Sequence, residues 1–491
     1  MGEVEIEAIL KRIAADRALL NDIDAYCKNP FVKDILAICG LRRTGKTILA
    51  LRQALNLIKS GRRVAYLQIN KGDSKQKLLA SINRAADNNT EYIFIDEITY
   101  IDGFARWADC VYNKTALKGI YCIIIGTDSF GLILASHELL FGRVEFIKTT
   151  HMPYADFKNV VNGSLSSYIH TGGVFGRIEM AEYVDASIAS NIVGSINRYD
   201  EMGYRILSEL EDDELRTAII KAVSRISIRF VIRILTRKYN YPEIGSAKQI
   251  LGRDIDEYIV ENEDKIKNEV YGALGLKEDL SRFSYEELGR FINYIRSIFV
   301  EIDAVTKYDI VSAGFDNEGF NTEKEYMLAQ PALRFEQTMV YLNILSSLDG
   351  AYQPLIKTIL QDIEGSLIEA VIISETVRKY LGKCDNESNR KYDVFKFNYM
   401  GREIDMVQYS YAAEALNLYE IKRTDNIYEG QCKNLNDAEV LEAVRNAVSI
   451  RNPLMGRIVY VNKHVLYSGV TLAEAVDGVR YVNIEDYLLS L

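Results

Sequence analysis

Eight residues near the start of the chain have the types and spacing of a phosphate-binding loop. Residues 35–39 are apolar and lead directly into Gly40-Leu-Arg-Arg-Thr-Gly-Lys46-Thr47. The two glycines let the backbone curl so that consecutive N–H groups face a polyphosphate, and the following helix points its positive end at the same anion. Lys46 would reach the β- and γ-phosphates, and the Thr47 hydroxyl would bind Mg²⁺. We therefore predict an ATP site, whose expected nucleotide contacts are Gly40, Arg43, Thr44, Gly45, Lys46 and Thr47.

A pair of carboxylates further along the chain fits the second half of such a site. Residues 92–95 form a short apolar run that ends at Asp96-Glu97. An acidic residue at the tip of a parallel strand can hold the water shell of Mg²⁺, a role that suits Asp96. Glu97 is then placed to polarise an attacking water. The alternative is a solvated strand end, which the order and distance of the two motifs disfavour.

The elements that must position these groups alternate between strands and helices. The apolar spacing predicts a helix from Lys46 that ends at Ser60-Gly61, a strand over 62–70 and a helix over about 75–86. A helix around 104–112, an apolar strand that ends at 126–129 and a last strand that opens at Gly142-Arg143 follow. This alternation is typical of an α/β fold with a parallel sheet.

The order of these motifs resembles a widespread prokaryotic group of AAA-type P-loop ATPases. The matching stretches are GLRRTGKT, IFIDEI, IIIGTDS, LLFGRVEF and MPYADF. The chain departs from the group's usual pattern at Leu41, Tyr154 and Asp156, none of which touches the phosphate chemistry. The resemblance implies a helical lid, which Tyr168 and Gly172-Gly173 match, and a C-terminal domain of restriction-endonuclease-like fold and unknown function.

Two polar residues of this core have roles that the AAA-type pattern suggests. Thr127 follows the strand expected beside residues 92–95 and could contact the γ-phosphate or the lytic water, although a turn-capping hydroxyl is an equal alternative. Arg143 could stabilise transition-state charge, within the chain or across a subunit boundary, or be a surface arginine. An arginine that acts in trans would require a homo-oligomer.

Three charged residues near the C-terminus could form a second catalytic site. A helix over 365–381, a hairpin over 392–409, a strand that contains Glu420-Ile-Lys422, a helix over 437–448 and a strand over 456–463 give an αβββαβ order. Alternation sends Glu420 and Lys422 to one face, where Asp405 of the neighbouring strand can join them. Two carboxylates around Mg²⁺ or Mn²⁺, with a lysine nearby, suit phosphodiester hydrolysis. The arrangement is similar to the PD-(D/E)xK nuclease core, in which Glu369 would match an acidic residue of the first helix.

The predicted organisation has four parts. They are a P-loop core over 1–150, a helical lid over 151–211, a helical region over 212–335 and a nuclease-like domain over 336–491. Strand-like pieces at 298–305 and 326–334 would give the third part the β-wing of a winged helix, a module that often binds DNA. A helical spacer is the alternative, and only the family resemblance favours the winged helix.

Composition restricts the classes of partner and compartment. The 491 residues carry a net charge of -10, which argues against a generally basic nucleic-acid coat, so any DNA contact must be local. The six cysteines contain no C-x-x-C pair, so neither a zinc site nor a disulfide framework is indicated. The first twenty residues lack the apolar centre of a signal peptide, and no later run reaches about 20 apolar residues. We expect a cytoplasmic protein without membrane spans.

These observations give a leading functional hypothesis and two alternatives. The leading one is an Mg-ATP hydrolase whose nucleotide state gates a DNA-directed C-terminal domain with metal-dependent nuclease chemistry. The first alternative is a nucleotide-dependent interaction switch that keeps a catalytically silent nuclease-like domain as a binding platform. The second, a small-molecule kinase, leaves Asp96-Glu97 and the C-terminal domain unexplained.

Overall fold

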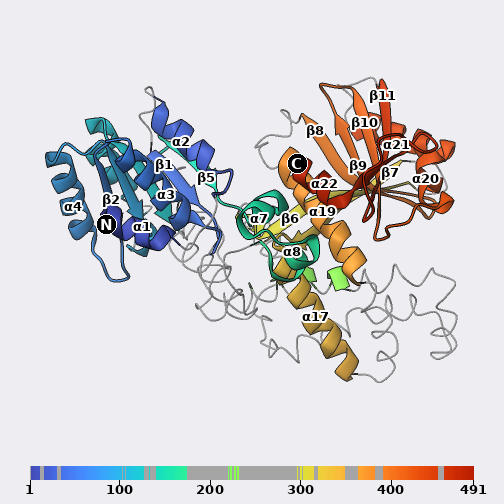
Figure 1. Ribbon diagram of the computed structural model, residues 1–491, viewed down its shortest axis with the longest axis horizontal. Helices are drawn as coiled ribbons and strands as arrows, with labels where there is room; N and C mark the ends of the chain where they lie inside the picture. Colours follow the sequence, from blue (N-terminus) through green and yellow to red (C-terminus); the bar gives the residue numbers. More distant parts are fainter. Residues whose placement is uncertain are drawn as a thin grey trace. The chain divides into compact units, whose positions relative to one another are not determined.

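The chain contains two compact units, which are described separately below (Figure 1). The computed structural model describes residues 2–11, 16–29, 35–41, 43–101, 103–104, 107–126, 132, 140–173, 302–313, 319–348, 363–381, 391–451 and 458–491, with scattered residues in 219–231 and 296–300. The first unit includes the described residues up to Ser164, and the second includes those from Val305 onward.

The first unit is built on a five-stranded parallel sheet. Its strands are β1 (Ile35–Cys39), β2 (Val64–Gln68), β3 (Tyr92–Asp96), β4 (Tyr121–Gly126) and β5 (Val144–Lys148). Their order is β2-β3-β4-β1-β5, and every neighbouring pair is parallel. The carboxyl ends of β1 and β3 therefore lie at one edge of the sheet, with β4 between them. The predicted parallel core is confirmed, including the position of β4 beside β3.

Helices cover both faces of this sheet, as the fully apolar strands require. One face packs against α1 (Glu3–Leu10), α2 (Leu20–Lys28) and α3 (Lys46–Lys59). The other face packs against α4 (Lys75–Asp87) and α5 (Ala108–Lys114). Helix α3 ends where the sequence predicts, since Ser60 caps it and Gly61 adopts a φ of +82°. After β5, the chain continues into α7 (Tyr154–Val161).

The second unit is built on a seven-stranded mixed sheet. Its strands are β6 (Val305–Ala313), β7 (Phe320–Leu328), β8 (Tyr392–Tyr399), β9 (Arg402–Ser410), β10 (Ala415–Lys422), β11 (Tyr460–Tyr467) and β12 (Arg480–Asn483), in the order β12-β11-β10-β9-β8-β6-β7. Strands β8, β9 and β10 pair antiparallel, whereas β11 runs parallel to β10. With α19 (Ile363–Leu381) before β8 and α21 (Ala438–Arg451) before β11, the predicted αβββαβ order is present.

Helices lie on both faces of the second sheet. The short helix α20 (Lys433–Asn436) and α21 pack on one face against Phe395, Phe397 and Ile404. On the other face, α19 contributes Glu369, which contacts Lys396 of β8. Tyr487 of α22 (Ile484–Ser490) hydrogen bonds to Thr376 of α19 at 2.8 Å, so these two helices are neighbours.

The hairpin β6–β7 differs from the sequence prediction. Strands were expected at 298–305 and 326–334 as the wing of a winged helix, but they occupy 305–313 and 320–328, where β6 pairs with β8 of the C-terminal sheet. Pro331 does not lie in a strand and instead begins α17 (Pro331–Leu348), which spans the expected boundary at 335. A proline favours the first turn of a helix because it has no N–H to donate. Apart from scattered helical residues in 219–231, the helices expected over 212–295 lie outside the described residues.

The expected lid also differs at its described end. Helix α7 belongs to the first unit, whereas residues 165–170 of α8 (Leu165–Thr171) belong to the second. Residues 174–211 of the expected lid lie outside the described residues. Among the helices that the structure describes, none combines the length and apolarity needed to cross a bilayer.

Candidate functional site

The loop after β1 has the backbone geometry that a phosphate cradle requires. Gly40 adopts a φ of +145° and Gly45 a φ of +92°, both rare for residues with a side chain. A Cβ atom on Gly40 would lie 2.2 Å from the carbonyl oxygen of Thr149, so the loop passes against the residue that follows β5. Helix α3 begins at Lys46, and its amino end faces the loop.

The Lys46 ammonium lies within the loop. Its Nζ donates hydrogen bonds to the carbonyl oxygens of Gly40 at 2.8 Å and Leu41 at 2.7 Å, and the residue is only 5% exposed. The hydroxyl of Thr44 donates to the Leu41 carbonyl at 2.7 Å, while Arg43 is exposed with a φ of +63°. These contacts place the lysine where an incoming anion would meet it.

Thr47 and Asp96 are brought together as the sequence predicts. The Thr47 hydroxyl lies 3.4 Å from Asp96 Oδ1, and the hydroxyl of Tyr66 donates to Asp96 Oδ2 at 2.9 Å. Burial raises the pKa of the fully buried Asp96, as does the nearby Glu97, while the bonds from Tyr66 and Thr47 oppose this. A hydroxyl and a carboxylate at this spacing are suited to Mg²⁺.

Glu97 follows Asp96 in a left-handed conformation. Its φ is +56° and ψ +38°, and its N–H donates to Asp96 Oδ1 at 3.0 Å. A non-glycine residue in this region is uncommon and is often found at functional sites. The sharp turn ends β3 directly after Asp96 and leaves the Glu97 side chain half-buried at the sheet edge.

A buried ion pair beside the loop was not predicted from the sequence. Arg17 Nε lies 3.0 Å from Asp156 Oδ2 of α7, and its Nη1 donates to the carbonyls of Thr44 at 2.6 Å and Thr150 at 3.2 Å. The N–H of Ala18 also donates to Asp156 at 3.1 Å. The guanidinium therefore connects the N-terminal segment, the phosphate loop and α7. Only the unusual Asp156 in the MPYADF stretch could have drawn attention to it.

Of two further residues predicted for this site, the structure describes only Arg143, and it does not lie near the loop. Arg143 immediately precedes β5, whose first residue pairs with Ile35 at the amino end of β1. It therefore lies at the sheet edge opposite the loop, where it is exposed and its guanidinium lies 4.9 Å from the Tyr112 ring centre. A role of Arg143 on its own chain's phosphates is thus contradicted, and a role across a subunit boundary stays a prediction. Thr127 lies outside the described residues.

The second unit gathers Asp405, Glu420 and Lys422. Lys422 Nζ lies 2.7 Å from Glu420 Oε2 and 3.7 Å from Asp405 Oδ2. The paired register of β9 and β10 ends at Met406 and Tyr419, and beyond it Asp405 Oδ2 accepts the N–H of Ile421 at 2.7 Å. A side chain thus replaces the backbone acceptor, so Asp405 is fixed where the two strands part.

Electrostatics at this group favour a bound cation. Glu420 is 4% exposed, and its Oε1 has no hydrogen-bond partner among the described residues. Burial and the neighbouring Asp405 raise the pKa of Glu420 to about 8, against the opposing effect of Lys422. Burial alone would lower the pKa of Lys422, but Asp405 and Glu420 outweigh it and raise that pKa. An unpartnered buried carboxyl oxygen is costly, and a metal ion would satisfy it.

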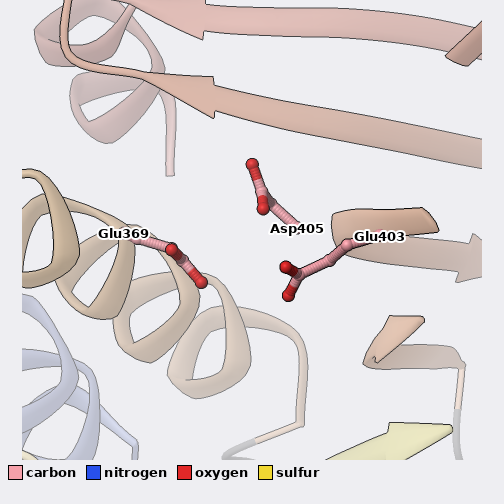
Figure 2. A group of neighbouring side chains, drawn as sticks. All are labelled: Glu369, Glu403 and Asp405. Carbon is pink, nitrogen blue, oxygen red and sulfur yellow. The ribbon is translucent and has the colours of Figure 1, made fainter. Parts of the chain in front are cut away.

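A second group of carboxylates surrounds Asp405 on the side of α19. Figure 2 shows Glu369 of α19 facing Glu403 and Asp405 of β9, and their oxygens lie within 4.8 Å of one another. Lys396 of β8 is paired with all three. Sequence reasoning found Glu369 and Asp405 but missed Glu403 and Lys396. The available signal was Lys396 itself, a charge within the apolar run YDVFKFNY.

Comparison with known proteins identifies the first unit's core. Residues 32–158 match the AAA domain family. A search of curated proteins found no significant match. Three solved structures are similar at low identity. They are AMPPCP-bound DnaA from Aquifex aeolicus (16% identity, 60% of this chain and 91% of that chain, TM-score 0.25), replication initiator DnaA bound to AMPPCP and single-stranded DNA (14%, 58% and 92%, 0.24), and the S. cerevisiae Hsp104–ADP complex (14%, 80% and 56%, 0.27).

The similarity of this region to AAA domains rests on the family match and on the geometry of the phosphate loop. Residues 32–158 match the AAA domain family, and the parallel sheet with its phosphate loop fits the AAA-type P-loop fold. The family match ends before the second unit. The function of that unit is therefore argued from its own residues.

Proposed function

We propose that the chain is an Mg-ATP hydrolase whose nucleotide state controls a DNA-directed C-terminal unit, because residues 32–158 match the AAA domain family. The observation that carries the hydrolase is the meeting of the Thr47 hydroxyl with the buried Asp96 carboxylate beside Lys46. The left-handed glycines of the loop provide the cradle into which a polyphosphate fits. Mg-ATP supplies the reactive phosphoanhydride and a cation that offsets the charge developed on its cleavage.

The residues of this site have separate roles in nucleotide binding and in water activation. Lys46 exchanges its two carbonyl partners for phosphate oxygens, and the loop N–H groups bind the same anion. Thr47 and Asp96 would hold the metal, and Tyr66 orients Asp96 through its hydroxyl. Glu97, fixed by the turn after β3, accepts the proton of the attacking water.

The test is steady-state ATP hydrolysis by three variants. Lys46→Ala should lose nucleotide binding and turnover, whereas Glu97→Gln should bind ATP normally and lose turnover by roughly 10²-fold or more. Lys59→Ala, at the exposed far end of the same helix, is the matched control and should match wild type. Full turnover in Lys46→Ala would refute the hydrolase proposal.

For the second unit we propose a PD-(D/E)xK-like phosphodiesterase centre. The support is the αβββαβ order and the convergence of Asp405, Glu420 and Lys422 where β9 and β10 part. Asp405 and Glu420 would hold one divalent cation, which the orphan Oε1 of Glu420 fits. Lys422 would stabilise charge on a scissile phosphate.

DNA cleavage with Mg²⁺ or Mn²⁺ tests this centre. Activity should disappear in Asp405→Ala and in Lys422→Ala, and cutting that survives both substitutions would point to a contaminant. If the wild type binds the metal and DNA without cutting, the alternative holds, namely an interaction switch with a catalytically silent nuclease-like unit. Glu97 speaks against a pure switch, because binding alone needs no water-activating carboxylate.

A further inference from the structure

Lys396 is a fully buried cation in the second sheet. Its side chain is 0% exposed, and its Nζ lies 2.5 Å from Glu369 Oε1 and 3.9 Å from Asp405 Oδ1 and is also paired with Glu403. A lysine is almost never buried to this extent unless it is paired. Three carboxylates from a helix and a strand thus converge on one ammonium.

A β-bulge creates this convergence. Phe395 of β8 pairs with Val407 and Phe397 with Ile404, so two residues of β9, Asp405 and Met406, lie opposite Lys396 alone. A bulge bends its strand and redirects its side chains. Ile404 and Val407 both pack into the core on the α21 face, so Glu403 and Asp405 lie on the opposite face, where both are paired with Lys396.

The same three carboxylates satisfy the geometric requirements of a divalent metal site (Figure 2). An ion bound among them would stand next to the Lys396 ammonium and would be repelled by it. By contrast, the Asp405–Glu420 pair has an unpartnered buried oxygen and a partner lysine that is partly exposed. The two acidic groups share Asp405, and each is paired with a lysine. Lys396 is fully buried and is paired with all three of its carboxylates, whereas Lys422 is partly exposed and leaves Glu420 Oε1 without a hydrogen-bond partner among the described residues.

We propose that Lys396 is the built-in cation of the Glu369–Glu403–Asp405 group, which it closes to divalent ions while it positions Asp405 toward Glu420. The second unit therefore binds one divalent ion rather than two. Glu369, which the resemblance to the PD-(D/E)xK core matches to the acidic residue of the first helix and so offers as a metal ligand, binds Lys396 instead. Only the placement of that single ion on Asp405 and Glu420 rests on the proposed function, whereas the role of Lys396 stands without it.

Counting bound Mn²⁺ tests the proposal. In the full chain without nucleotide, free Mn²⁺ measured by electron paramagnetic resonance gives the number of bound ions. Lys396→Met should bind one ion more than wild type, and Lys396→Arg, which keeps the charge, should not. An unchanged number in a folded Lys396→Met would overturn the proposal. A wild type that binds no Mn²⁺ refutes the proposed nuclease-like centre, yet a gain of one ion in Lys396→Met would still support the role of Lys396.

A second variant covers the case in which Lys396→Met does not fold. Glu403→Gln removes one carboxylate and keeps Lys396. If the group is closed to metal, Mn²⁺ affinity should stay within about threefold of wild type, because Glu403 is not a ligand. A loss of about tenfold or more would show that Glu403 holds or orients the metal and would contradict the proposal. Asp405→Asn, which removes a proposed ligand, is the positive control for such a loss.

Discussion

At the scale of single residues, Gly40 sets the shape of the phosphate loop. Its φ of +145° excludes other residues on conformational grounds, and an added Cβ would also meet backbone atoms of Thr149. Gly61 has a positive φ as well, but an added Cβ there has no heavy atom within 4 Å. An alanine at Gly61 would therefore introduce backbone strain alone, whereas an alanine at Gly40 would introduce both backbone strain and steric overlap with Thr149.

We predict that Gly40→Ala lowers ATP affinity by about tenfold or more, because the loop must shift away from Thr149. Gly61→Ala should leave affinity unchanged and cost only about 1–2 kcal/mol of stability, from its left-handed conformation. Titration with a fluorescent ATP analogue and thermal unfolding measure the two effects. Equal affinities in the two variants would show that the approach of Gly40 to Thr149 does not matter.

Arg17 gives a second prediction at this scale. Arg17→Met leaves the Asp156 carboxylate buried without its cation, which should destabilise the first unit by about 3–5 kcal/mol. It should also weaken ATP binding, because the Thr44 carbonyl loses its donor. The control is Arg52→Met, since the more exposed pair of Arg52 with Asp16 should contribute about 1 kcal/mol or less. Chemical denaturation that finds similar costs for both would contradict the structural role of Arg17.

At the scale of elements, one arginine connects three parts of the second unit. Arg451 at the end of α21 lies 2.8 Å from Asp309 of β6 and 2.8 Å from Asp393 of β8. Asp309 also pairs with Lys324 of β7 at 2.6 Å. Burial alone would raise the pKa of Asp309, but Lys324 and Arg451 outweigh burial and lower that pKa. The charged form of Asp309 therefore stabilises the joint between the hairpin and the sheet.

A lowered pKa in the folded state fixes the sign of the pH dependence. Asp309 stabilises the fold above its unfolded pKa of about 3.9, and this contribution is lost as the pH falls through the lower folded value. Asp309→Asn should thus cost about 1–3 kcal/mol at pH 7, and the difference from wild type should vanish in acid. Hydrogen exchange of β6 and β8 peptides, from pH 7 to well below the unfolded pKa of Asp309, measures it, with exposed Asp425→Asn as control. A difference that persisted in acid would rule out the ionic origin.

At the scale of the whole molecule, control of the second unit by nucleotide requires reciprocal coupling. If ATP changes the affinity for DNA, DNA must change the affinity for ATP by the same factor, typically about 5- to 150-fold. We predict such a change when ATP binding is titrated with and without single- and double-stranded DNA. The Lys422→Ala variant should reduce it. No change with any nucleic acid would refute the gating while leaving the hydrolase and the metal site standing.

The sequence determined the local chemistry of both units. Glycine spacing, apolar strands and a terminal Asp-Glu predicted β1 to β5 and the phosphate loop, because these features depend on short-range backbone geometry. The meeting of Thr47 with Asp96 was also predictable, because parallel strands bring their carboxyl ends to the same edge of the sheet. Alternation likewise predicted β8 to β10 and the grouping of Asp405, Glu420 and Lys422. Only the AAA domain is identified by comparison with known proteins.

Tertiary structure decided where charges find partners. The buried Asp309 of β6 is paired with Lys324, which lies opposite it on the neighbouring strand β7, and with Arg451 of α21, which is distant in the sequence. The sequence did not reveal that Arg143 lies at the edge of the sheet opposite the phosphate loop. That position depends on the parallel register of β5 with β1. The pairing of Lys396 with carboxylates of β9 depends on a β-bulge, which the alternation of apolar and polar residues does not predict. Lys46 and Thr47 of the phosphate loop could be predicted from the sequence, because their neighbours along the chain position them. The pairing of Lys396 with three carboxylates of the second unit could not, because it depends on the tertiary fold.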